Sequence, residues 1–468
     1  MKIRHISKND LEHACKDMLV RGARFVMVYG VSIEKYSLEL RYLINVAPQQ
    51  FELWRCYLAH HDKPVSLANH CPLLGWYERE VMDLFGVEFL HHPEPYSLIT
   101  HPEEFHYPDF SQQGLQYLPF GPIRAGIVES AEFDFFYAGE SIPYFYQKLF
   151  FKHRGMEQRF CGLSADLGVL LAERVSGIGS VSHAWSYCQA VEKTADCHLS
   201  KRAEYSRIIL AELERLYNHL HFFGDLCHAT TLKVGAAEGL LLEERLKQIN
   251  ARVTGHRLLR HVLTPGGLRS ELKLAGLKPK LLTLQSDIFS YLNRLQNTAS
   301  HVDRLLHTGV VTKKMALDQG ATGPIERAAG FDHDLRRDHV YSCYADFNIA
   351  VPVCSEGDAQ ARATVRMKEI EVSFAIILAA LDQLPAGAIK TECVIKPSSE
   401  GLAWVESPRG GTFYAVHVDA QGKLARVKIK SASYSNWRVF PFTVHETGMM
   451  DFAINEASFG LSIAGCDR

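Results

Sequence analysis

The segment over residues 153–192, HRGMEQRFCGLSADLGVLLAERVSGIGSVSHAWSYCQAVE, sets charged side chains among apolar ones. These charged residues are His153, Arg154, Glu157, Glu173 and Arg174. Such groups could line a polar cavity between helices, where paired charges hold protons or a cofactor. They could equally form buried salt bridges that only orient the helices. The residue pattern by itself leaves both interpretations open.

Helices must position these groups, because apolar residues recur at three- and four-residue steps along three long stretches. The stretches are 200–228, 278–308 and 360–384. The segment 153–192 is predicted to be helical too, with interruptions at Gly177 and Gly179. Two β pieces flank these helices, one over 133–137 and a hairpin over 411–430.

The first hundred residues predict a small α/β unit. We expect a helix over 11–19 and strands over 24–29, 37–46 and 51–59. A second helix should end at Gly86, since glycine readily stops a helix. Prolines and the polar run SQQG place a domain boundary near 105–117.

Composition excludes several classes of protein. Of 468 residues, 47% are apolar and 22% charged, which is typical of a packed globular chain. A formal net charge of −2 offers no positive field for nucleic acid. No apolar run is long enough to span a bilayer, and charges near the N-terminus argue against a signal peptide, so we expect a cytoplasmic protein. Eleven cysteines without CxxC spacing predict neither a disulfide framework nor a self-contained zinc or iron–sulfur site.

Two motifs resemble the large subunits of energy-converting, membrane-bound nickel–iron hydrogenases. LAERVSGIGSVSH resembles the first metal-binding stretch of that family, which reads ERVCGIC and then, after three residues, His. The matching residues are Glu173, Arg174, Val175, Gly177, Ile178 and His183. ASFGLSIAGCDR, residues 457–468, is similar to the family's SFDPCxxCTDR.

The resemblance places the family's four thiolate ligands on residues that carry no thiol. The four positions are Ser176, Gly179, Ser462 and Gly465. Nickel and iron need soft anionic sulfur there, whereas a hydroxyl resists deprotonation and glycine supplies no donor. We therefore predict that this chain holds no nickel–iron centre. The alternative is that Cys188, Cys197 or Cys466 rebuilds a metal site.

Other segments extend the resemblance over nearly the whole chain. GPIRAGIVESAEF places Glu129 at the family's proton-relay glutamate, and ESPRG places Arg409 in a loop that overhangs the metal site. WYEREVMDLFG resembles the small hydrophilic component of respiratory complex I that is called C. The resemblance thus implies an α+β fold. Residues 1–105 would form a small α/β domain like that component, and residues 106–117 a linker. Residues 118–468 would form a large, mainly helical domain with small β elements, similar to the hydrogenase large subunit and to the D component of complex I.

The quinone-binding residues of complex I are missing as well. That family uses a His in an HPxxHG loop and a Tyr just ahead of its DR pair, where this chain has GPIRAG with Arg124, and Leu171. Without both donors, a quinone carbonyl would lack hydrogen-bond partners during reduction. The nearest class is therefore the hydrogenase-related complexes that lack the nickel ligands.

The resemblance implies a peripheral subunit on the cytoplasmic side of a membrane complex. Its partners would be an iron–sulfur small subunit of the complex I type, which carries the cluster, and antiporter-like membrane subunits; the chain itself would bind no cofactor. We expect a cavity to transmit redox-linked charge changes toward ion translocation. Its residues would be Glu129, Glu157, Glu173, His183 and Arg409. Two alternatives stay open, namely a quinone-reducing subunit like that of NADH-quinone oxidoreductase and a purely structural docking subunit.

Overall fold

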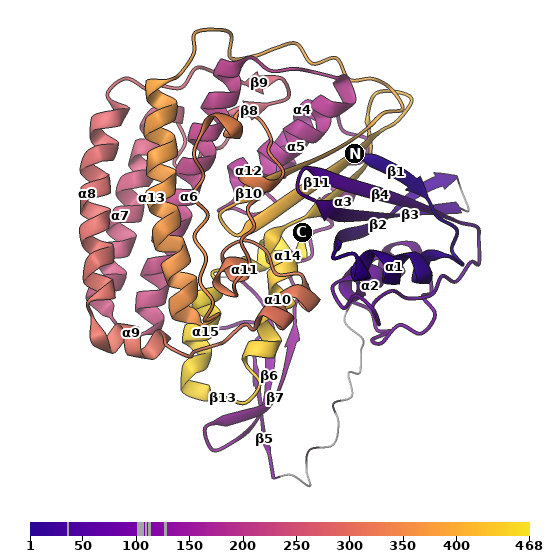
Figure 1. The fold of residues 1–468 in the computed structure, drawn as a ribbon, viewed down its shortest axis with the longest axis horizontal. Coiled ribbons are helices and arrows are strands. Elements are labelled where there is room, and N and C mark those ends of the chain that lie inside the picture. Colours follow the sequence, from indigo (N-terminus) through magenta and orange to yellow (C-terminus); the bar gives the residue numbers. More distant parts are fainter. Residues whose placement is uncertain (35–36, 101–106, 108–109, 111–113, 126–128) are drawn as a thin grey trace.

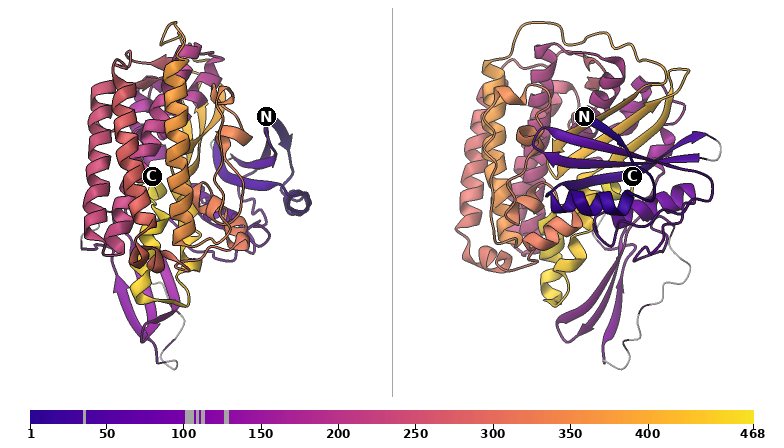
Figure 2. Two further views of the ribbon diagram at one scale, coloured as in Figure 1. Left: turned by 60° about the vertical axis from the view of Figure 1, so that its left-hand side comes forward. Right: turned by 45° about the vertical axis from the view of Figure 1, so that its right-hand side comes forward.

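The computed structural model of the chain describes all residues except 35–36, 101–106, 108–109, 111–113 and 126–128. Figure 1 shows two modules side by side, a small sheet-and-helix module formed by residues 1–100 and a larger helical module formed by residues 114–468. Figure 2 shows the same arrangement from two further directions.

The N-terminal module is a four-stranded sheet with two helices. Its strands are β1 (Lys2–His5), β2 (Arg24–Glu34), β3 (Ser37–Ala47) and β4 (Gln50–Leu58), in the order β1-β4-β3-β2. β1 runs parallel to β4, and the other pairs are antiparallel. The helices are α1 (Leu11–Val20) and α2 (Leu74–Phe85). α2 ends at Gly86, whose φ of 68° is costly for other residues.

Long helices dominate the second module. α6 (Lys201–Ala229), α7 (Lys233–Thr254), α8 (Leu277–Gln296) and α13 (Ala359–Asp382) stand side by side in Figure 1. Side-chain caps start two of them, since Ser200 accepts a hydrogen bond from the Ala203 amide and Asp358 from the Ala361 amide. Two further helices pack against this bundle, α5 (Ser180–Ala195) on α6 and α9 (Ala299–Leu305) on α8 and α13. α4 (Ala165–Ala172) packs on α5, and the short α3 (Met156–Arg159) lies against the strand over Leu424–Lys430. No helix within the described residues is both long and apolar enough to cross a membrane.

Short helices and turns connect the bundle to the rest of the module. They are α10 (Lys313–Gln319), α11 (Pro324–Ala328), α12 (Leu335–Asp338), η2 (Tyr344–Asp346), α14 (Ala432–Trp437), η3 (Phe440–Thr443), η4 (Met449–Asp451), α15 (Phe452–Phe459) and α16 (Ile463–Asp467).

Three further sheets complete the helical module. The first is antiparallel and consists of β10 (Glu400–Ser407), β11 (Gly410–Val418) and β12 (Leu424–Lys430), in that order. The second projects from the body in Figure 1 and has the order β13-β7-β6-β5. Its strands are β5 (Gln116–Phe120), β6 (Glu132–Ala138), β7 (Ser141–Lys148) and β13 (Thr447–Gly448). The third pairs β8 (Leu263–Thr264) with β9 (Gly267–Leu268).

One apolar core joins the two modules. The Phe51 ring of β4 stacks on His339 with 4.0 Å between centroids and meets the Trp404 ring edge-on at 4.7 Å. Tyr77 of α2 packs against Tyr434 of α14 at 4.8 Å. Four of these rings are buried, and the Trp404 ring is half-buried. Burial of apolar surface therefore holds the two modules together, as it also stabilises each module by itself.

The structure confirms the expected α+β architecture, with a small α/β module followed by a mainly helical one. The helices over 200–228 and 360–384 are present within a residue or two, whereas the stretch 278–308 divides at Asn297 into α8 and α9. Half of the predicted linker, 106–117, lies outside the described residues, and β5 already begins at Gln116.

Candidate functional site

The four former ligand positions come together in space. Ser176 precedes α5, Ser462 precedes α16, and the Ser176 hydroxyl donates to the Ser462 hydroxyl at 3.3 Å. A Cβ atom added at Gly465 would lie 3.5 Å from the Ser176 Cβ, and one added at Gly179 would lie 3.8 Å from it. We call Ser176, Gly179, Ser462 and Gly465 the serine–glycine cluster.

The serine–glycine cluster does not fit a nickel–iron centre. Its two oxygen donors bond to each other, and Ser462 Oγ also accepts from the Gly465 amide at 3.0 Å, as the N-cap of α16. The two glycines offer no donor atom, and neither hydroxyl is a soft anionic ligand. Burial raises the pKa of the neighbouring Cys466 thiol well above its usual value, which keeps it protonated. Within the described ranges, no three His, Cys, Asp or Glu side chains are grouped as metal ligands.

Glu129 lies at the edge of the serine–glycine cluster. Its carboxylate accepts hydrogen bonds from the Ile463 amide, from the Ala464 amide at 3.0 Å and from the Ser462 hydroxyl at 3.3 Å. The first two amides have no partner within α16, so the carboxylate satisfies donors that the short helix leaves open. Glu129 therefore fixes the segment that carries two of the four cluster positions.

His183 lies on the first turn of α5, directly behind the cluster. A Cβ added at Gly179 would lie 3.3 Å from its ring, and its Nδ1 meets the Tyr414 hydroxyl at 2.9 Å. Burial, reinforced by the charges of Arg154 and Arg409, lowers the pKa of His183 to about 3. The imidazole is thus neutral at physiological pH and cannot carry charge there.

Arg409 bridges three elements around the cluster. From the β10–β11 turn it donates to the Asn218 side-chain oxygen at 2.6 Å and to the Gly460 carbonyl at 2.7 Å. Asn218, on α6, in turn donates to the Ile178 carbonyl at 2.8 Å, inside the loop that carries two cluster positions. Burial lowers the pKa of Arg409, while Glu129 is the first of several acidic neighbours that oppose this shift.

A buried carboxylate that the sequence analysis missed lies nearby. Glu214 of α6 accepts from the Val181 amide at 2.6 Å and from the amide and hydroxyl of Ser182, at the start of α5. Burial raises the pKa of Glu214, although these hydrogen bonds and Arg409 oppose the shift. The available signal was a polar stripe on an otherwise apolar helix, because Glu214 and Asn218 are four residues apart.

The other two predicted cavity residues lie in separate contacts. Glu157 pairs with Arg426 at 2.8 Å and with Lys428 and Arg468 at 3.1 Å each. Glu173 accepts from the His261 amide at 2.8 Å, and burial raises its pKa. Of the five predicted residues, the structure thus gathers Glu129, His183 and Arg409 around the cluster, and it gives Glu157 and Glu173 other neighbours.

The residues at the quinone-binding positions also have other roles. Arg124 Nη1 donates to both carboxylate oxygens of Glu456 on α15, at 2.7 and 3.0 Å, and the guanidinium lies 4.7 Å from the Phe133 ring centroid. Leu171 is half-buried and packs against the apolar core of the helical module. Leu171 has no hydrogen-bond donor, whereas Arg124 is held by Glu456 through Nη1 and keeps Nε and Nη2 buried without a partner among the described residues.

Comparisons with known proteins show the family to which the chain belongs. The model of the respiratory-chain NADH dehydrogenase 49 Kd subunit matches residues 239–394 and 388–468, and that of the 30 Kd subunit matches residues 4–113. The membrane-bound hydrogenase subunit alpha of Pyrococcus furiosus is 33% identical, over 75% of this chain and 87% of its own length. This chain belongs to the large-subunit family shared by membrane-bound hydrogenases and complex I.

Further members of the large-subunit family match over most of the chain. The formate hydrogenlyase subunit 5 of Escherichia coli is 26% identical over 82% of this chain and 74% of its own length. Among solved structures, a chain of the membrane-bound sulfane sulfur reductase, an archaeal respiratory membrane complex, superposes with a TM-score of 0.72 at 25% identity, covering 76% of this chain and 98% of that one. These matches confirm the resemblance seen in the motifs.

Proposed function

We propose that this chain is the large subunit of a membrane-bound, complex I-like respiratory oxidoreductase complex that works without a nickel–iron centre. The observation that carries the proposal is the hydrogen bond between Ser176 and Ser462, where the resemblance places two of four thiolates. Hydroxyls bonded in this way, beside two glycines, leave no soft anionic donor for nickel.

In this proposal the subunit transmits a charge change instead of carrying out chemistry on a metal. Reduction of a cluster in a partner iron–sulfur subunit would add negative charge near Arg409, Glu129 and Glu214. A neighbouring charge shifts the pKa of a buried carboxylate, so Glu214 is placed to take up and release a proton. Arg409 links α6 to both loops of the cluster, which offers a route for a mechanical response.

The proposed setting follows from the relatives. The chain would sit peripherally on the cytoplasmic side of the membrane and contact a complex I-type iron–sulfur small subunit and antiporter-like membrane subunits. It would bind no cofactor itself. The membrane-bound hydrogenase and the sulfane sulfur reductase are named as membrane complexes, which supports membrane partners for this chain.

Metal analysis of the purified complex tests the absence of the nickel–iron centre. We expect less than one nickel per ten complexes, iron in the amounts that clusters require, and no hydrogen uptake. A nickel-containing hydrogenase of the family, handled in parallel, controls for metal loss during purification. Stoichiometric nickel or hydrogen uptake would refute the proposal.

Coupling is tested with Glu214→Gln in membrane vesicles. We expect the complex to assemble and to transfer electrons while ion translocation falls at least tenfold, because the amide cannot exchange a proton. Glu173→Gln is the matched control, since it also removes a buried carboxylate but lies outside the cluster. Loss of assembly with Glu214→Gln would favour a docking role alone, and reduction of quinone analogues would favour a quinone-reducing subunit.

A further inference from the structure

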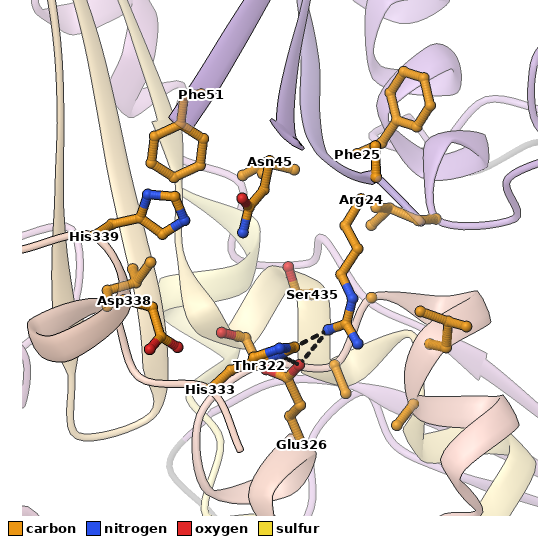
Figure 3. Close-up of a pocket in the computed structure, with 18 of the residues that line it drawn as sticks. Arg24, Phe25, Asn45, Phe51, Thr322, Glu326, His333, Asp338, His339 and Ser435 are labelled. Carbon is orange, nitrogen blue, oxygen red and sulfur yellow. Dashed lines mark hydrogen bonds and ion pairs between the residues drawn. The ribbon is translucent and has the colours of Figure 1, made fainter. Parts of the chain in front are cut away.

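A cavity of about 660 Å³ lies between the two modules, away from the serine–glycine cluster. The N-terminal module contributes Arg24, Asn45 and Phe51, and the helical module contributes His339, Lys430 and Ser435. Figure 3 shows the Phe51 and His339 rings next to each other at one edge of this space, and Asn45 and Ser435 between them and Arg24. This size suits a small organic molecule.

The acidic side chains of the cavity already have partners. Glu326 accepts from Arg24 at 2.6 Å and contacts His333 at 2.7 Å, as the dashed lines in Figure 3 show. Glu406 accepts from Arg327 at 3.0 Å. Asp338, also on the wall, accepts from Arg337 at 2.8 Å. The carboxylates are therefore compensated inside the protein and leave little attraction for a cationic ligand.

In contrast to the carboxylates, a lysine, a serine and a histidine of the cavity wall keep unused hydrogen-bonding groups. Lys430 is 4% exposed, and its ammonium donates to the Gly411 carbonyl at 3.0 Å, which uses one of three donors. Both ring nitrogens of His339 are buried without a hydrogen-bond partner among the described residues, and the Ser435 hydroxyl has only the Tyr77 hydroxyl in its neighbourhood, with which it forms no hydrogen bond of normal geometry. Buried polar groups in proteins are nearly always paired, so these atoms indicate a ligand or water that completes them.

Apolar side chains form the remaining walls. Val46, Pro48, Leu73 and Leu317 line the cavity, and the Phe413 ring centroid lies 5.1 Å from the Lys430 nitrogen. A buried cation with free donors beside apolar walls matches a molecule with a carboxylate head and an apolar body.

We propose that this cavity binds a small organic carboxylate, whose head pairs with Lys430 and whose apolar body lies between the modules. Lys430 supplies a charge-assisted hydrogen bond to the carboxylate, and Ser435 and His339 supply neutral ones. The ligand would contact both modules at once, so its binding would stabilise their association. The body can be an aliphatic chain or an aromatic ring, since either suits the apolar walls.

Calorimetric titration of the full chain tests the site with matched acids and alcohols. The aliphatic pair is octanoate and octanol, and the aromatic pair is 2-naphthoate and 2-naphthol. We expect at least one acid to bind ten times more tightly than its alcohol. Tenfold corresponds to about 1.4 kcal/mol. Whichever of the two acids binds more tightly shows whether the apolar body of the ligand is aliphatic or aromatic.

Lys430→Met then removes the charge while keeping the length of the side chain. We expect acid binding to weaken at least tenfold and alcohol binding to stay unchanged. Lys193→Met is the control, because Lys193 also donates to one carbonyl, that of Leu402 at 2.6 Å, but it lies on another cavity. It should leave both affinities as they are.

Three results would overturn the proposal. They are equal affinities for acid and alcohol, unchanged acid binding in Lys430→Met, and no binding of either acid at millimolar concentration. If Lys430→Met fails to fold, the comparison of acid with alcohol on the unaltered chain still decides.

Discussion

Replacing Glu157 by Gln should destabilise the protein strongly, because this carboxylate compensates three cations in the interior. Glu157 is 8% exposed, and Lys428 and Arg468 beside it are 1% and 3% exposed. Removing one member of a buried ion pair costs about 3–5 kcal/mol, since the charge left behind stays desolvated. Lys428 and Arg468 keep a second partner, Glu80, at 2.5 and 3.2 Å. We therefore expect the free energy of unfolding to fall by an amount near the lower end of this range, about 3 kcal/mol.

The pH dependence of this loss has a definite sign. Burial alone would raise the pKa of Glu157, but Lys428, Arg426 and Arg468 lower it below its ordinary value of 4.5. The stabilisation is therefore fully present above about pH 4.5 and is lost only as the pH falls through the lowered pKa. The difference between the original chain and Glu157→Gln should be constant from about pH 8 to pH 5 and shrink at lower pH.

Guanidinium unfolding followed by far-ultraviolet circular dichroism measures both quantities. Glu173→Gln is the control, because Glu173 is also buried but its ion-pair neighbour, Arg174 at 3.4 Å, has a 42% exposed side chain that water can solvate. That variant should lose less than about 1 kcal/mol at pH 7. Equal losses for the two variants, or a loss below about 1 kcal/mol for Glu157→Gln, would refute the reasoning.

Two further predictions concern the glycines and the former quinone loop. In unfolding experiments, Gly465→Ala should change stability by less than about 1 kcal/mol, because its Cβ would meet Ser462 at an ordinary 3.4 Å. Gly309→Ala should lower the free energy of unfolding by about 2 kcal/mol or more, because its φ is 60° and the added Cβ would lie 1.9 Å from Asn455 Oδ1. Similar losses of stability at the two glycines would contradict this prediction. Arg124→Met should cost about 3 kcal/mol at pH 7 and less at pH 5, because burial raises the pKa of Glu456, which accepts a proton once unpaired; a cost that grows on acidification would contradict this.

Apolar spacing was enough to predict the helices that pack through large side chains. α6 and α13 have such spacing, and the structure contains both. α7 was missed because it approaches α6 through glycine, where a Cβ added at Gly239 would lie 3.0 Å from Gly224 Cα. Only glycine permits such a close backbone contact. Glycine has a low helix propensity, and it lacks the apolar side chain that the spacing pattern requires. β10 was missed similarly, since Gly401 passes directly under Ala190 of α5.

The candidate site could be predicted only in part. The four cluster positions came from resemblance, since Ser176 and Ser462 are 286 residues apart and local spacing says nothing about their contact. Glu157 was expected at the cavity because it precedes the first motif closely, yet two of its partners, Arg426 and Lys428, come from β12 and the third is Arg468. Glu80 belongs to the motif WYEREVMDLFG, but only the fold shows that its charge faces Lys428.

The ion pair between Glu80 and Lys428 has a consequence for biosynthesis. Its two members are separated by 348 residues. At roughly 5–20 residues per second, a ribosome needs about 17–70 s between them. During that interval the Glu80 carboxylate of the nascent N-terminal module lacks both of its cationic partners, Lys428 and Arg468. The joining of the two modules through these ion pairs is therefore a late event of synthesis.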